Sequence, residues 1–270
     1  MRWKPVRWPG SQRSALSFSF DLDAASVWLA IDSANAEKPG VLSQGKYGPR
    51  VGVPLILDLL ERRGVKATFF VPGTMAEQHA ETVREIVASG HELAAHGYTH
   101  DSPTKLSYAE EDDSLARTRS ILEGFGARVA GYRSPAWEFS KNTLELLEKH
   151  GFEYSSNMMD DIRPYRHEST SVVELPVQWI LDDAVHFWFD YRAWTKKIST
   201  PSEVREIWES EFRGIHELGG VFVLTMHPQV IGRPYRLEVL DRFIEFVQRQ
   251  EDAWIAPCGE VAAAFRDSGS

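Results

Sequence analysis

Two hydrophobic periodicities alternate along the chain. Residues 15–20 place an apolar side chain at every second position, as in a strand with one buried face. Residues 51–63 space apolar side chains by three or four, which is the helical period, and Gly64 follows where a helix would end. Further strands are predicted at 67–71, 92–95, 129–132, 152–155, 172–175, 221–226 and 254–255, and further helices at 81–89, 108–125, 141–149, 201–218, 236–250 and 260–266.

This repeated alternation of strand and helix predicts the fold class. Strands that alternate with helices form a parallel sheet, either open and doubly wound or closed into a barrel. No repeat, low-complexity run or linker divides the chain, so we expect a single α/β domain over residues 15–266. Residues 1–14 are polar, contain two prolines, and are expected to form a surface strap.

Two stretches fit neither period. Residues 31–50 carry Gly, Pro and Ser and are predicted to form a long loop, of the kind that acts as a lid or an oligomer contact. The segment 179–194 is rich in aromatic residues and is expected to wall a pocket or an interface. Its aromatic residues include Trp179, Phe187, Trp188, Phe189 and Trp194.

Composition narrows the function classes. The 270 residues are 43% hydrophobic, and one α/β barrel of about 250 residues would account for this length. A net charge of −9 argues against a general role on nucleic acid or membrane surfaces. With one cysteine there is no internal disulfide, and no apolar run approaches the roughly 18 residues that span a bilayer. Basic residues near the N-terminus precede no apolar stretch, so we expect no signal peptide and a cytoplasmic location.

Candidate metal ligands come directly after predicted strands. Asp21 and Asp23 end the first strand, and His96 and His100 lie four residues apart after another. Parallel α/β folds collect their active sites at the carboxyl ends of strands, so these side chains are expected to meet. One Asp and two His form a hydrolytic metal set, for which Zn²⁺ is the leading candidate. We therefore expect Asp23, His96 and His100 to bind one divalent metal.

Other interpretations of these residues exist. Two histidines four apart often lie on a helix surface, and two acids after a strand can form a solvated turn. The same three side chains match the facial triad of Fe(II) oxygenases, although those sites usually lie on all-β folds. The other histidines, which are expected to be structural, include His79, His91, His150 and His216.

Three further residues complete a set that can hydrolyse amides. A bound Zn²⁺ would lower the pKa of its water to near 7 and polarise a carbonyl. Asp21 could take the proton of that water, and Arg133 could hold the carboxylate through a bidentate contact. His227 could protonate the departing amine. Pro135 and Trp137 follow Arg133 and are expected to form a rigid apolar lip.

Four of these segments, in this order, resemble the motifs of the polysaccharide deacetylases of the NodB-homology type, carbohydrate esterase family 4. Residues 19–23 (Ser-Phe-Asp-Leu-Asp) are similar to the family's Thr-Phe-Asp-Asp-Gly, and residues 96–100 (His-Gly-Tyr-Thr-His) to its His-Ser/Thr-x-x-His. Residues 133–135 match Arg-x-Pro, and residues 224–227 match Leu-x-x-His. Order and spacing agree from residue 15 to about residue 260.

The resemblance implies a distorted (β/α)7-type barrel, the NodB fold, with a bound divalent metal: Zn²⁺ first, with Co²⁺, Ni²⁺ or Fe²⁺ as alternatives. It implies that Asp21 is the base, that Asp23, His96 and His100 are the metal ligands, and that His227 is the acid. The residues expected to bind substrate are Tyr98, Pro135, Trp137 and Trp179.

The chain departs from the family pattern in two places. The first motif lacks its glycine, and no Ser or Thr follows His96. Together with residues 45–50 and 160–165, this variant resembles a cytoplasmic branch of peptidoglycan-deacetylase-like proteins and of ureide or cyclic-imide hydrolases related to metal-independent allantoinase. Members of that branch tend to be homo-oligomers, so a dimer or tetramer is expected. The fourth motif is carried over as Asp161, a partner for Arg133 or His227.

The sequence therefore predicts a metal-dependent amidohydrolase that removes an N-acyl group, most simply N-acetyl, from an amino sugar or small amide. A backbone N–H near Tyr98 is expected to help hold the oxyanion. One alternative is a ring-opening ureide or imide hydrolase that needs no metal, in which His96 and His100 bind the substrate directly. Another is a carbohydrate-binding protein without catalysis, although no acid or histidine of the set is missing. No nucleic-acid or membrane partner is expected.

Overall fold

The computed structural model describes residues 6–189 and 197–268. Within these residues a largely parallel sheet of nine strands runs in the order β6-β7-β5-β4-β3-β2-β1-β8, with β9 paired to β1 and only β6 antiparallel. The strands are β1 (Ser14–Asp21), β2 (Thr68–Val71), β3 (Glu92–Ala95), β4 (Gly131–Tyr132), β5 (Tyr154–Ser155), β6 (Tyr165–Arg166), β7 (Val173–Glu174), β8 (Val221–Met226) and β9 (Ala253–Ile255).

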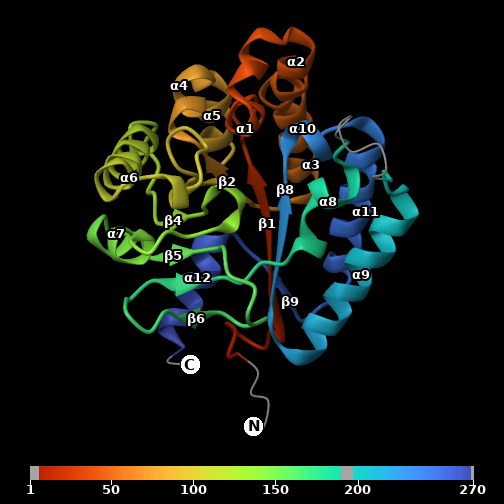
Figure 1. The fold of residues 1–270 in the computed structure, drawn as a ribbon. Coiled ribbons are helices and arrows are strands. Elements are labelled where there is room, and N and C mark those ends of the chain that lie inside the picture. The colour runs from red at the N-terminus through yellow and green to blue at the C-terminus, as the bar shows by residue number, and fades with distance from the viewer. Residues whose placement is uncertain (1–5, 190–196, 269–270) are drawn as a thin grey trace.

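Helices cover the outside of this sheet (Figure 1). They are α1 (Ser26–Ile31), α2 (Pro39–Tyr47), α3 (Val53–Arg63), α4 (Gly73–Gln78), α5 (Ala80–Ala88), α6 (Tyr108–Glu123), α7 (Thr143–Lys149), α8 (Asp183–Phe187), α9 (Pro201–Leu218), α10 (Pro228–Ile231), α11 (Pro234–Gln248) and α12 (Cys258–Asp267). The predicted strand at 92–95, helix at 201–218 and strand at 221–226 have the observed bounds of β3, α9 and β8.

The sheet curves into an incompletely closed barrel. The sheet ends in β6 on one side and β8 on the other. Among the described residues, one isolated parallel bridge, between Asp182 and Thr225, connects β8 to the segment that follows β7. The single-domain α/β fold and the distorted barrel expected from the sequence are therefore confirmed. No helix in the described part of the chain has both the length and the apolar character needed to cross a membrane.

Strand β1 runs through the centre and is buried on both faces. Its apolar positions, including Phe18 and Phe20, pack with the apolar faces of the surrounding helices. The alternate positions Ser17 and Ser19 are also buried, and their hydroxyls donate to the carbonyls of Ala256 and Leu224. The polar half of the pattern therefore faces the inside of the barrel rather than solvent, and it leads into the acids at the end of β1.

The prediction of a loop over residues 31–50 is wrong, because most of this stretch is helical. It contains a 3-10 helix (Ser33–Glu37), α2, and a π-helical turn (Gly48–Gly52) that continues into α3. Gly45 in this stretch serves close packing rather than a loop, and so does Gly52 at the end of the π-helical turn. A Cβ at Gly45 would lie 2.4 Å from the Ala24 oxygen, and one at Gly52 would lie 2.2 Å from the Pro228 oxygen.

The N-terminal strap is anchored to the body of the protein where it is described. Val6 and Trp8 are buried, and both the Val6 backbone N–H and the Trp8 indole N–H donate to the Gly219 oxygen. Residues 1–5 of the strap lie outside the described residues, as does Trp194 of the aromatic stretch. The described part of that stretch, residues 179–189, contains a 3-10 turn (Trp179–Leu181) and α8.

Candidate metal centre and active site

Three side chains converge where β1 and β3 end. Asp23 Oδ1 lies 3.4 Å from His96 Nε2 and 3.4 Å from His100 Nε2. Asp23 and His96 are almost fully buried, and His100 is nearly so. One ligand atom from each residue falls within 4.8 Å of the others, which is the spacing of a shared metal site. The two distant stretches singled out in the sequence therefore meet.

The local backbone explains how each stretch presents its ligands. After β1, the Ser26 backbone N–H and hydroxyl both donate to the Asp23 carbonyl, which fixes a turn. After β3, His96 and His100 belong to a loop and not to a helix turn. Gly97 has φ of 70° and His100 has φ of 67°, so the loop includes a non-glycine residue in the left-handed region. Such strain persists where the surroundings require one geometry, as they do at many functional sites.

A hydrogen bond sets the tautomer of His96. Its Nδ1 lies 2.7 Å from the Arg133 carbonyl oxygen, to which it donates. The Nε2 lone pair is therefore left facing Asp23. A histidine that binds a metal through one ring nitrogen typically donates from the other to a carbonyl or carboxylate, as His96 does here.

The donor set fits a divalent cation. Asp23 Oδ1 is buried and has no hydrogen-bond partner, although buried polar atoms normally find one. Burial by itself would raise the pKa of Asp23, but His100, His96 and His227 outweigh burial and hold that pKa well below its usual range. An ionised, unpaired carboxylate oxygen between two imidazole nitrogens is a suitable environment for a metal ion.

Arg133 organises the neighbouring acid. This fully buried guanidinium donates from Nη1 to Asp21 Oδ1 at 2.8 Å and to Ser19 Oγ at 2.9 Å. Its Nε and Nη2 donate to the backbone oxygen and the hydroxyl of Ser156. The second oxygen of Asp21 lies 4.0 Å from His96 Nε2, so Asp21 faces the candidate metal site formed by Asp23, His96 and His100. The contact with Arg133 is to one Asp21 oxygen, not the bidentate pair expected.

His227 approaches from the end of β8 and is held by a carboxylate. Its Nε2 lies 3.6 Å from Asp23 Oδ2, and its Nδ1 lies 2.7 Å from Asp183 Oδ1. Asp183 Oδ2 also accepts the His227 backbone N–H. Burial would lower the pKa of His227, but Asp182 and Asp183 raise it well above its usual value. The geometry favours a protonated imidazole whose Nε2–H faces the site.

Asp182 and Asp183 were not identified from the sequence, since they lie in the aromatic stretch that showed no clear element. Burial raises the pKa of Asp182 to about 7 and raises that of Asp183 above its usual value. The sequence did contain one signal: Asp182 is the N-cap of α8, accepting from the Ala184 N–H, and an Asp before a helix is a recognisable start.

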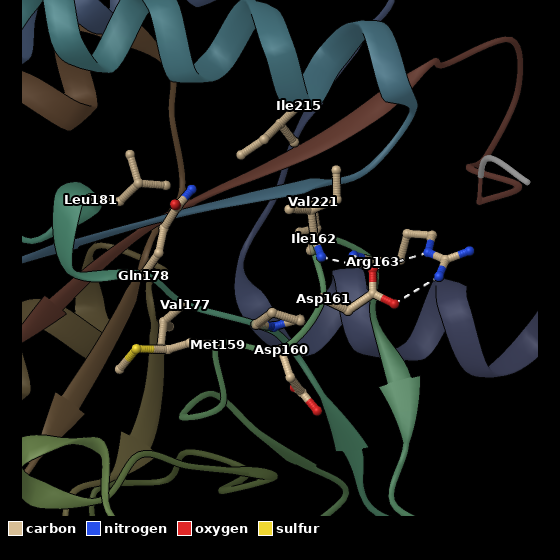
Figure 2. A pocket seen from close by; sticks show the side chains of 11 residues that line it. Met159, Asp160, Asp161, Ile162, Arg163, Val177, Gln178, Leu181, Ile215 and Val221 are labelled. Carbon is tan, nitrogen blue, oxygen red and sulfur yellow. Dashed lines mark hydrogen bonds and ion pairs between the residues drawn. The ribbon is translucent and has the colours of Figure 1, made fainter. Parts of the chain in front are cut away.

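The assignment of Asp161 is corrected by the structure. Its carboxylate forms an ion pair with Arg163 and accepts the backbone N–H groups of Ile162 and Arg163 (Figure 2). It lines a pocket of about 490 Å³ at the first residue of β8, Val221, whereas His227 follows the other end of that strand. Six residues of strand separate these points by about 20 Å. The partner of His227 is Asp183 instead.

A buried glutamate, Glu174 on β7, was also missed. Its Oε1 accepts the backbone N–H groups of Asn157 (2.5 Å) and Met158 (2.9 Å), and its Oε2 accepts the Ser155 hydroxyl. His167 Nε2 lies 2.9 Å from the same Oε2. Glu174 therefore holds the segment 155–158 that in turn holds Arg133.

Tyr98 does not have the expected position. Its hydroxyl donates to Glu77 on α4, and its ring lies under the guanidinium of Arg117 on α6, 3.9 Å from the centroid. An oxyanion donor was expected among the backbone N–H groups near Tyr98, and the N–H of Tyr98 itself already donates to Ser114 Oγ. Packing of the loop against α4 and α6 explains both contacts, since a Cβ at Gly73 would lie 2.5 Å from the Tyr98 ring.

The segment expected to form an apolar lip is a rigid, largely buried turn. Pro135 and Trp137 are buried in a 3-10 turn, and Ala136 and Trp137 both have φ of 57°. The Trp137 ring packs against that of Trp179, with centroids 4.5 Å apart. Trp179 remains half exposed, so the pair presents an aromatic surface to solvent. Its role toward substrate stays a prediction.

Comparison with known proteins identifies the family. Residues 36–155 match the family model described as polysaccharide deacetylase. The peptidoglycan deacetylase of Helicobacter pylori is 30% identical over 280 residues, an alignment that covers 93% of this chain and 95% of that protein. The chain belongs to the polysaccharide deacetylase family. It is accordingly a hydrolase that acts on carbon–nitrogen bonds other than peptide bonds.

Solved structures agree with this membership. A Mycobacterium smegmatis structure described as a polysaccharide deacetylase has a TM-score of 0.94 and 39% identity, with 99% of this chain and 96% of that chain covered. The Puue allantoinase has a TM-score of 0.84 over 98% of this chain and 94% of its own, at 24% identity, and shows that the fold is shared. The resemblance found in the motifs is therefore confirmed.

Proposed function

We propose that this deacetylase is a metal-dependent amidohydrolase that removes an N-acetyl group from an amino sugar. The observation that carries the proposal is the buried Asp23 oxygen, unpaired and equidistant from the Nε2 atoms of His96 and His100. These three residues would hold the ion, with Zn²⁺ preferred for an oxygen and two imidazole donors. When bound, the ion would supply Lewis acidity toward an acyl carbonyl and a water.

Asp21 is proposed as the general base. It is buried beside the metal ligands, and Arg133 and its hydrogen bonds fix the direction of the carboxylate. A base must lie within hydrogen-bond reach of the proton that it abstracts, and Asp21 faces the space next to His96 Nε2.

His227 is proposed as the general acid. Asp183 fixes the ring through Nδ1, so the proton on Nε2 is the one that can pass to the leaving nitrogen. The nearby carboxylates stabilise the protonated ring, which keeps the proton available until the amide bond breaks. The Asp183–His227 pair thus gives the site a proton donor that is separate from the base.

The proposed substrate class is supported by the relatives. The Helicobacter pylori relative, which aligns over nearly the whole chain, is a peptidoglycan deacetylase. A chitooligosaccharide deacetylase of Bradyrhizobium is 42% identical over 116 residues, 41% of this chain and 53% of that protein. Both act on N-acetylated glycans by name. The cytoplasmic location and the homo-oligomeric state stay predictions.

A substrate screen tests the proposal. Purified protein, analysed for bound metal, is assayed for acetate release from chitotetraose and soluble peptidoglycan fragments, and for ring opening of allantoin, hydantoin and succinimide. We expect acetate release that stops with a chelator and returns with Zn²⁺. Ring opening without acetate release would contradict the proposal and establish the ureide or imide alternative.

A further inference from the structure

A cavity of about 420 Å³ lies among α1, α2, α8, α10 and α11, and no role has been assigned to it above. Three segments around it lie close in the sequence to residues of the active site. Trp28 is on α1, which starts three residues after Asp23, and Gln229 on α10 lies two residues after His227. Trp188 directly follows α8, the helix that begins with Asp183. Figure 1 shows α1, α2 and α10 near the upper end of β8, the end that His227 follows.

Gln229 supplies a polar group that lacks a partner. Its side chain lines the cavity and only 5% of the residue is exposed, yet neither its amide oxygen nor its amide nitrogen has a hydrogen bond. Leaving a buried polar group unpaired is costly, so such a group calls for a ligand or another specific explanation. An amide offers both a donor and an acceptor, which suits a ligand with hydroxyl or carboxylate groups.

The charge in the cavity is positive. Arg233 and Arg236 line it, and no Asp or Glu is found among its described lining residues. Their close contacts are neutral: Arg236 donates to the Val230 carbonyl and to the Tyr235 hydroxyl, and Arg233 lies 3.5 Å above the Tyr47 ring. In a chain of net charge −9, two guanidinium groups with no carboxylate in the described lining favour an anionic ligand.

An aromatic wall completes the cavity. The rings of Trp28 and Trp188 stack with centroids 4.6 Å apart. Such indoles give a flat apolar surface against which the face of a sugar ring can pack, while their polar edges stay available.

We propose that this cavity is a subsite for a carboxylate-bearing sugar unit of the substrate, held by Arg233, Arg236 and the Gln229 amide. The inference rests on the proposed function, because it assigns a second sugar unit of the same substrate to a cavity lined by residues that follow Asp23, Asp183 and His227 in the chain. It goes beyond that function because a subsite with two guanidinium groups would make the enzyme prefer substrates with an acidic amino sugar over neutral ones.

The first test uses two probes that differ in one group. N-acetylmuramic acid carries a lactyl carboxylate that N-acetylglucosamine lacks. Calorimetric titration of the wild-type protein at 50 and 500 mM NaCl is expected to show about tenfold tighter binding of the acidic sugar at low salt. That preference is expected to shrink at high salt, as partly exposed charges are screened. Equal affinities at both salt concentrations would overturn the proposal.

Variants locate the effect. Arg236→Gln and Gln229→Glu are each expected to reduce the ratio of acidic to neutral affinity to near one, the second by adding a negative charge. Arg242→Gln is the matched control, since Arg242 is on the same helix but pairs with Glu238 outside the cavity. If the ratio of acidic to neutral affinity falls as much in Arg242→Gln as in the cavity variants, the subsite is rejected. It is also rejected if that ratio falls in neither Arg236→Gln nor Gln229→Glu. Wild-type protein that deacetylates chitotetraose without any acidic preference keeps the proposed function and rejects only this inference.

Discussion

At the scale of single residues, Asp23 has the most demanding environment in the site. It is 1% exposed, and its Oδ1 faces two imidazole nitrogens without a hydrogen bond. A side chain in this position stabilises the fold only if a cation or protonated histidines balance its charge. The geometry therefore ties Asp23 to metal binding more directly than to packing.

The first prediction concerns this ligand. Asp23→Asn is expected to lose bound metal and to lower kcat/KM roughly a thousandfold, because metal assistance supplies several kcal/mol of transition-state stabilisation. Elemental analysis and acetate release are the measurements. Asp161→Asn is the control and is expected to keep both metal and activity, since Asp161 pairs with Arg163 far from the site. A metal-replete, active Asp23→Asn protein would remove the metal centre from the mechanism.

At the scale of elements, short contacts between segments position the side chains that act. The end of β5 holds Arg133 through Ser156, and Glu174 on β7 holds that segment through two backbone N–H groups. Arg133 in turn orients Asp21 and accepts from His96. Glu174 is therefore a positioning residue that acts through Arg133.

The second prediction tests this connection. Glu174→Gln puts an amide where two backbone donors point, so the segment should shift and kcat should fall roughly 10- to 100-fold, with KM and metal content little changed. Glu153→Gln is the control from the residue before β5, where the carboxylate pairs with Arg128 and Arg266 instead. If KM rises and kcat is retained, or if both variants behave alike, Glu174 has only a structural role.

The third prediction concerns the packing of the helices around residues 31–52. Gly52→Ala is expected to destabilise the protein by about 1–3 kcal/mol, since its Cβ would lie 2.2 Å from the Pro228 oxygen and backbone would have to move. Gly40→Ala, in α2 with no atom within 4 Å of the new Cβ, is expected to stabilise it by about 0.4–1 kcal/mol. Urea unfolding measures both, and equal effects would contradict the close-packing account.

At the scale of the whole molecule, buried titratable groups set how stability depends on pH. His91 is buried at the start of β3, where its Nδ1 accepts the Ala67 backbone N–H. Burial lowers the pKa of His91 to about 4. In the unfolded chain the same group titrates near 6.5, so between these values only the unfolded state takes up the proton.

The fourth prediction follows from this difference. The free energy of unfolding is expected to fall as the pH drops from about 6.5 to about 4, with His91 contributing roughly 2–3 kcal/mol over the full range. His91→Asn keeps an acceptor for the Ala67 N–H but does not titrate, so it should flatten the pH dependence. Urea unfolding at pH 7 and pH 5 checks this, and an unchanged slope in the variant would contradict it.

The sequence by itself determined the alternation of strands and helices and the order of the reactive residues. Periodicity is a local property, and for this reason β3, α9 and β8 were predicted with their observed bounds. The expectation that Asp23, His96 and His100 meet also needed only a general rule, that parallel strands bring their carboxyl ends to one edge. Motif order then sufficed to identify the family.

Only the tertiary structure decided which residues support that site. Asp183 and Glu174 act through partners 44 and 17 residues away, and no local pattern encodes such pairs. Gly45 was read as a loop signal because the reason for a glycine there, the close approach of the Ala24 backbone, is not visible in the chain. Tyr98 and Asp161 were selected by their position relative to a motif. In the structure, Tyr98 packs against α4 and α6 and donates to Glu77, and Asp161 forms an ion pair with Arg163. Which residues can bind a metal follows from their side-chain chemistry and can be read from the sequence. How those side chains are oriented depends on contacts between segments that are distant in the sequence.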